Sequence, residues 1–217
     1  MYLYISTHVS NHFELKCILH ETIKLIKMKT PATNFTFLIL LITSILFVSC
    51  EKDEFYELEI NDKNPVIEKS INGIDFKFCL LNENGEPATI FNEYENIIFQ
   101  FSITNKTGND IYFDESVINS DGFYEIMDKT ISYGTPFEKP VFFDLRMPAP
   151  IGNGVVTGIN IKWIPEEEEW NVGLANFLKA DTNPLQKGIY YTEFSHEFDF
   201  DSVKTEKLKF RINFEIK

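Results

Sequence analysis

The stretch Leu208-Lys209-Phe210-Arg211-Ile212-Asn213-Phe214-Glu215-Ile216 places an apolar residue at every second position. Successive side chains of a β-strand point to opposite faces, so this alternation predicts a strand with one buried face and one solvated face. The buried row would hold five large side chains, while the residues between them are all polar. We therefore expect this final strand to be a central element of the core.

The same period of two recurs upstream, and turn-forming residues such as Asn82-Glu83-Asn84-Gly85 and Gly152-Asn153-Gly154 separate the runs. Further strands are expected at residues 74–80, 97–103, 111–113, 123–127, 141–145 at a sheet edge, 157–163 and 189–200. The spacing of Trp170, Leu174, Phe177 and Leu178 predicts one short helix. Strands without alternating helices favour an all-β fold, an antiparallel immunoglobulin-like β-sandwich of Greek-key type, with a Greek-key barrel as the alternative.

The N-terminal part has a different pattern. Residues 35–48 form an apolar run of 14 residues, which is short for a membrane-spanning helix but suits the apolar region of a signal peptide. The run ends in Phe47-Val48-Ser49-Cys50, which resembles the lipobox of bacterial lipoproteins although Phe47 stands where leucine is usual. The resemblance implies that Cys50 is acylated and becomes the first residue of the mature protein.

Lys52-Asp53-Glu54 follows directly and resembles the export signal of surface lipoproteins from Bacteroidetes-type bacteria. It implies a lipid-anchored protein of the outer membrane, exposed at the cell surface. Met28-Lys29 makes a suitable start for such a signal peptide. We thus expect residues 1–27 to be a mis-assigned extension, 28–49 the signal peptide, 50–70 the acylated cysteine with a flexible tether, and 71–217 the sandwich domain.

The chain is acidic, with a formal net charge of −13 at pH 7. Removing residues 1–49 makes it more acidic, because that segment holds four lysines and two carboxylates. Nucleic-acid binding needs clustered Lys and Arg, so we expect no nucleic-acid partner. The expected partners are the membrane, through the acyl chains on Cys50, and an extracellular glycan or protein.

Catalytic chemistry finds little support in the motifs. His196 is the only histidine after Cys50, and neither a Gly-x-Ser-x-Gly elbow nor a His-Glu-x-x-His motif accompanies it. Cys79 has no base or positive charge beside it in the sequence and is expected to be a structural, half-buried thiol. We expect no metal, no cofactor and no enzymatic activity.

The candidate binding site is the run Trp163-Ile164-Pro165-Glu166-Glu167-Glu168-Glu169-Trp170. Adjacent carboxylates repel one another and must be solvated, which places Trp163 inside and Trp170 at the rim, with Glu167 and Glu168 beside it. Trp170 either caps the core or contacts a ligand, since tryptophan is common both in cores and at binding sites. Ser202, in Asp201-Ser202-Val203, resembles an O-glycosylation acceptor of Bacteroidetes-type bacteria.

The order of elements over residues 76–200 is similar to that of the immunoglobulin-like family of bacterial intracellular proteinase inhibitors. Two motifs carry the resemblance: Asn105-Lys106-Thr107 after a strand, and Gly188-Ile189-Tyr190 before a late one. We expect a non-enzymatic ligand-binding or adhesion module. A proteinase inhibitor and a carboxylate-based glycan hydrolase, which needs only two placed acidic groups, are the alternatives.

Overall fold

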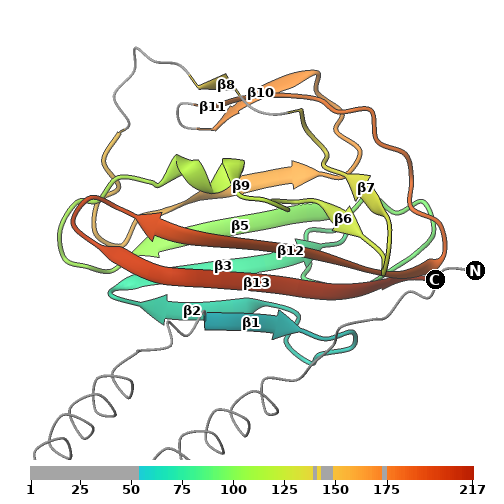
Figure 1. Ribbon diagram of the computed structural model, residues 1–217, viewed down its shortest axis with the longest axis horizontal. Coiled ribbons are helices and arrows are strands. Elements are labelled where there is room, and N and C mark those ends of the chain that lie inside the picture. Colours follow the sequence, from blue (N-terminus) through green and yellow to red (C-terminus); the bar gives the residue numbers. More distant parts are fainter. Residues whose placement is uncertain (1–53, 139–140, 143–148, 173–174) are drawn as a thin grey trace, which may run out of the picture. The chain divides into compact units, whose positions relative to one another are not determined.

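The computed structural model describes residues 54–138, 141–142, 149–172 and 175–217, all of which belong to one compact unit, Lys52–Lys217. This part of the chain is all-β, with antiparallel pairing in most of its sheets (Figure 1). Over the described ranges, none of the helices has the length and apolar character needed to cross a membrane. The predicted all-β class is confirmed.

The largest sheet is built on the hairpin of β12 (Gly188–Asp199) and β13 (Lys204–Ile216). Its strand order is β1-β13-β12-β6-β7, with β4 also pairing with β13. The remaining strands are β1 (Glu54–Leu58), β4 (Ile90–Phe91), β6 (Ile126–Met127) and β7 (Ser132–Gly134). β1 and β4 run parallel to β13, whereas the other pairs are antiparallel. β13 is thus the central strand that its alternation predicts.

The second sheet has the order β2-β3-β5-β9 and is antiparallel throughout. Its strands are β2 (Ile67–Ile71), β3 (Ile74–Leu81), β5 (Ile98–Asn105) and β9 (Val156–Lys162). β5 alternates strictly between buried and half-buried residues, so one face of this sheet packs inward and the other meets solvent.

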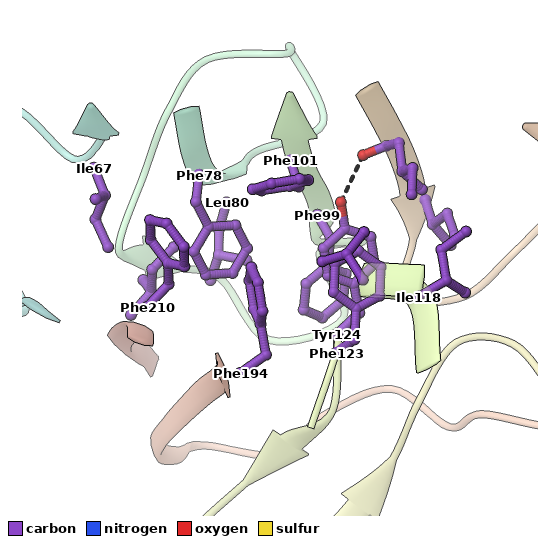
Figure 2. Close-up of a cluster of buried hydrophobic side chains, with 14 of the residues drawn as sticks. Ile67, Phe78, Leu80, Phe99, Phe101, Ile118, Phe123, Tyr124, Phe194 and Phe210 are labelled. Carbon is purple, nitrogen blue, oxygen red and sulfur yellow. Dashed lines mark hydrogen bonds between the residues drawn. The ribbon is translucent and has the colours of Figure 1, made fainter. Parts of the chain in front are cut away.

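Aromatic side chains from the two sheets form the core between them (Figure 2). Phe78 of β3 contacts Phe194 of β12 edge to face at 5.2 Å between ring centroids, and Phe101 of β5 stacks on Phe198 at 5.7 Å. Such pairs stabilise by about 0.5–1.5 kcal/mol beyond the area they bury. The two sheets share no strand over the described residues, so the arrangement is a sandwich of two packed layers.

A crossover segment between β5 and β6 closes one side of this core. It contains a 3₁₀ helix, η2 (Glu115–Asn119), which the alternation pattern does not predict. Tyr124 follows it, is fully buried, stacks on Phe123 at 4.1 Å and donates its hydroxyl to the carbonyl of Ile159 at 2.6 Å (Figure 2). The hydrogen bond removes the cost of burying the hydroxyl, so this tyrosine fixes the crossover to β9.

The helix predicted around Trp170 is wrong. Residues there form the hairpin of β10 (Glu169–Val172) and β11 (Ala175–Leu178), and β8 (Val141–Phe142) adds a third, edge strand. Trp170 lies opposite Phe177 across the hairpin. Residues seven apart share a face after two turns of helix, but Trp170 and Phe177 also meet across the β10-β11 pair, so the spacing could not distinguish the two.

The flexible tether predicted for residues 50–70 is also wrong from Glu54 onward. β1 pairs along its whole length with β13, and β2, which begins at Ile67, pairs with β3. Tyr56 packs on Phe210 at 5.6 Å, and the side chain of Leu58 is buried. Edge strands are short and charged, so their sequences resemble linkers.

Candidate functional site

The two tryptophans of the candidate stretch have different surroundings. Trp163, just beyond β9, is 2% exposed, and its indole N–H donates to the Asn183 carbonyl at 2.8 Å. Trp170 in β10 is half-buried and stacks on Phe177 with ring centroids 5.6 Å apart and planes within 9°. The prediction of Trp163 as a core residue is confirmed, and Trp170 lies at the margin of the core.

The indole N–H of Trp170 is buried and has no hydrogen-bond partner among the described residues. An unpaired buried donor costs about 1–3 kcal/mol. A phenylalanine could stack on Phe177 in the same way without that cost. Packing alone therefore does not explain why a tryptophan is found here.

Trp170 lines a small hollow of about 220 Å³ between the end of β9 and the acidic loop. Its lining combines an aromatic ring with amide, ammonium and carboxylate groups: Asn160, Ile161, Lys162, Pro165, Glu166, Glu167 and Trp170. Lys162 forms an ion pair with Glu166, whereas Glu167 has no ion-pair partner in the part of the chain that the structure describes. We call this hollow the Trp170 pocket.

The structure separates the two predicted carboxylates. Glu167 lines the Trp170 pocket together with Trp170, as its place beside the tryptophan suggested. Glu168 does not line it. Its side chain is 87% exposed and lies 3.6 Å from the ammonium of Lys179. These neighbours in sequence provide a matched pair of positions, one inside the pocket and one outside.

A wider hollow of about 780 Å³ lies over the solvent face of the β2-β3-β5-β9 sheet and also includes Asn160. Its middle is lined by Gln100, Ser102 and Gly158. A Cβ on Gly158 would lie 2.3 Å from the Phe101 carbonyl oxygen, so any larger residue would push β9 away from β5. Asn160 lines both hollows, so they adjoin at this residue.

Cys79 is fully buried, deeper than the half-buried position predicted for it. Its thiol contacts the Gln100 side-chain oxygen at 3.3 Å. Burial raises the pKa of this thiol to about 11. The thiolate is therefore scarce at neutral pH, which agrees with a structural role.

Of the other residues singled out in the sequence, some lie outside the described residues, Ser202 is exposed and Asn105 is buried. Cys50, Lys52 and Asp53 are outside them, and Glu54 is the first residue of β1. Ser202 is exposed in the turn between β12 and β13. Asn105 is fully buried, and its side chain donates to the carbonyls of Asn109 and Ile151, each at 2.7 Å.

His196 has partners that the sequence pattern did not reveal. Its ring nitrogens lie within 3.1 Å of Asp114, Ser116 and Ser120, all from the segment around η2. About eighty residues separate the histidine from them, and no short motif contains all of them. A search for local motifs could not find this cluster.

Within the described residues, no group of three or more His, Cys, Asp and Glu side chains has an arrangement that could hold a metal ion.

Fold and site together define an all-β sandwich with a small aromatic pocket on its edge. Comparison with protein families, with curated proteins and with solved structures found no match for this chain.

Proposed function

We propose that this chain is a lipid-anchored surface protein whose sandwich domain binds an extracellular glycan without turnover at the Trp170 pocket. The observation that carries the proposal is the meeting of an aromatic ring, a free carboxylate and an amide in one hollow. Sugars present an apolar ring face and polar hydroxyls on its rim. The indole of Trp170 can cover the apolar ring face. Glu167 can accept hydrogen bonds from the hydroxyls, and the Asn160 amide can both donate hydrogen bonds to them and accept hydrogen bonds from them.

The size of the Trp170 pocket favours one sugar unit of a longer chain. Pockets for whole drug-sized ligands usually measure about 300–1,000 Å³. The 220 Å³ here is smaller, but the pocket shares Asn160 with the wider hollow above β5 and β9. A chain end or branch would occupy the Trp170 pocket while neighbouring units lie over the sheet.

The unpaired indole N–H supports a binding role for Trp170. The position carries a residue with a larger aromatic surface than phenylalanine, although its buried N–H is costly. A tryptophan at this position is expected if the site needs a large aromatic surface for a ligand, and not only stability of the fold.

The test is a glycan array followed by titration of any glycan that binds. We expect Trp170→Ala to weaken binding by about 30-fold or more, since hot-spot aromatics contribute at least about 2 kcal/mol. Trp170→Phe should weaken binding while leaving the melting temperature equal or higher. Glu167→Gln should reduce affinity and Glu168→Gln should not, because only Glu167 lines the pocket.

Equal effects of the two glutamate variants would contradict the assignment of the pocket. Binding that survives Trp170→Ala unchanged would place the ligand elsewhere. Release of sugar products would instead support the hydrolase alternative, and slowed proteolysis in mixing assays would support the inhibitor alternative.

A further inference from the structure

The cluster around His196 shares no residue with the Trp170 pocket. His196 lies near the end of β12, while Asp114 and Ser120 flank η2 on either side as its N-cap and C-cap residues. The fold brings these two segments together, so one imidazole touches a carboxylate through Nε2 and a serine hydroxyl through Nδ1.

The carboxylate of Asp114 is held by several donors. Its Oδ2 accepts from His196 Nε2 at 3.0 Å and from the backbone N–H of Asp199 at 2.8 Å. Its Oδ1 accepts from the backbone N–H of Ser116 at 3.0 Å and from the Ser116 hydroxyl. Burial alone would raise the pKa of Asp114, but the hydrogen bonds from His196, Ser116 and Asp199 outweigh it and hold that pKa below its ordinary value. The group is an anion at neutral pH.

These contacts determine where the protons lie. A carboxylate can only accept, so Nε2 of His196 must carry a proton toward Asp114. The Ser116 hydroxyl proton goes to the other carboxylate oxygen. In the neutral imidazole Nδ1 then has a free lone pair, which can accept a hydrogen bond from the Ser120 hydroxyl 2.9 Å away.

We propose that Ser120 is an activated nucleophile, with His196 Nδ1 as its general base and Asp114 as the residue that orients the imidazole, able to accept an acyl or phosphonyl group from a small activated ester. A serine, a base within hydrogen-bond reach and a third group that orients the base are the parts that such activation requires. Here the two ring nitrogens have exchanged the roles they have in serine proteases, which is chemically allowed because either nitrogen can act as the base.

In the acyl step, Ser120 Oγ forms a bond to the ester carbonyl carbon while its proton moves to Nδ1. The C–O bond of the leaving alcohol then breaks, and Nδ1 returns the proton to that oxygen. Water, deprotonated in the same way, releases the acyl group and restores Ser120. No oxidant or further reactant is needed.

The arrangement is held in place before any ligand arrives. The His196 ring packs edge-on against Phe198 at 4.7 Å between centroids, and its side chain is only 14% exposed. Ser120 is half-exposed and follows the last turn of η2, where its backbone N–H donates to the Val117 carbonyl. A small reagent can therefore reach the hydroxyl while the base behind it is fixed.

Labelling of the full-length protein with a fluorophosphonate at pH 8, followed by peptide mass spectrometry, tests the proposal. We expect a phosphonyl group on Ser120, formed as Oγ displaces fluoride from phosphorus. His196→Gln should slow labelling by about 100-fold or more, the range that general base catalysis contributes. Ser120→Ala should abolish it, and Ser202→Ala, at an exposed turn position outside the cluster, should retain it.

A second measurement does not depend on variants that might fold poorly. Nitrogen NMR of the histidine ring, assigned by the signal lost in His196→Gln, should show the proton on Nε2 and none on Nδ1 at neutral pH. A proton on Nδ1 would overturn the proposal. So would a wild-type protein that does not label at Ser120, or labelling that His196→Gln leaves at the same rate.

Discussion

The side chains of Trp163 and Trp170 differ in burial and in hydrogen bonding. Trp163 is enclosed by the core and its N–H is paired, so truncation should leave a cavity and an unpaired carbonyl. Trp163→Ala should lower the free energy of unfolding by about 3–5 kcal/mol. Trp170→Phe should lower it by less than about 1 kcal/mol or raise it, because the stacking on Phe177 is kept and the unpaired N–H is removed.

Denaturant unfolding of both variants measures this difference. A loss for Trp170→Phe as large as that for Trp163→Ala would show that the indole of Trp170 is needed for packing. The unpaired indole N–H of Trp170 would then no longer support a ligand-binding role.

Cys79 provides a test of burial at a single atom. Because burial raises the pKa of its thiol to about 11, we expect almost no thiolate at pH 8 in the folded protein. A thiol reagent should modify Cys79 slowly in the native state and rapidly in denaturant. Fast native modification would mean that β3 opens readily or that the thiol is accessible.

At the scale of elements, β13 should be the strand whose packing matters most. Phe210 contacts Phe78, Phe101 and Phe194 with centroids 5.2–6.3 Å apart. Phe210→Ala should cost about 3–5 kcal/mol, a large part of a typical domain stability of 5–15 kcal/mol. The measurement is the free energy of unfolding in denaturant.

Arg211, on the other face of β13, is the matched control. It forms ion pairs with Glu57 and Glu193 and covers the Tyr191 ring at 4.0 Å, but it is partly exposed to water. Arg211→Ala should therefore cost only about 1 kcal/mol or less. Similar losses for Phe210→Ala and Arg211→Ala would contradict this account of the two faces.

A second prediction at this scale is that β1 contributes to the stability of the domain, although its sequence resembles a linker. The Leu58 side chain is buried, whereas Phe55 is 47% exposed in the same strand. Leu58→Ala should destabilise the domain by about 2–5 kcal/mol and Phe55→Ala by much less. If both changes left the melting temperature unaltered, β1 would be a dispensable extension of the sheet.

For the whole molecule, the proposed anchor and the first strand have a geometric consequence. Only residues 51–53 separate Cys50 from β1, and three residues span at most about 11 Å. An acylated Cys50 would hold the domain close to the lipid surface rather than on a long tether. Two or more acyl chains are needed for a stable anchor of this kind.

Metabolic labelling with a fatty-acid analogue tests the anchor. We expect label on the wild-type protein and none on Cys50→Ala, because acylation needs the thiol. Protease treatment of intact cells should remove the domain, and replacing Lys52, Asp53 and Glu54 by alanine should protect it by retaining the protein inside. Equal labelling of both proteins, or unchanged protease sensitivity, would contradict the lipoprotein interpretation.

The sequence by itself determined the strands with strong alternation, β3, β5, β9, β12 and β13, and with them the all-β class. A period of two is a local property, and each of these strands buries one face, so the pattern is preserved in the fold. The difference between Trp163 and Trp170 was also visible, because four charges between them had to be solvated.

Only the tertiary structure decided the rest. β1 becomes a strand through its pairing with β13, about 150 residues away, and β10 pairs with β11, with Trp170 packed on Phe177 across the pair. Asp114, Ser120 and His196 meet because η2 lies against the end of β12. Pairing, packing and proton positions depend on contacts between distant segments, and such contacts leave no periodic signal in either segment alone.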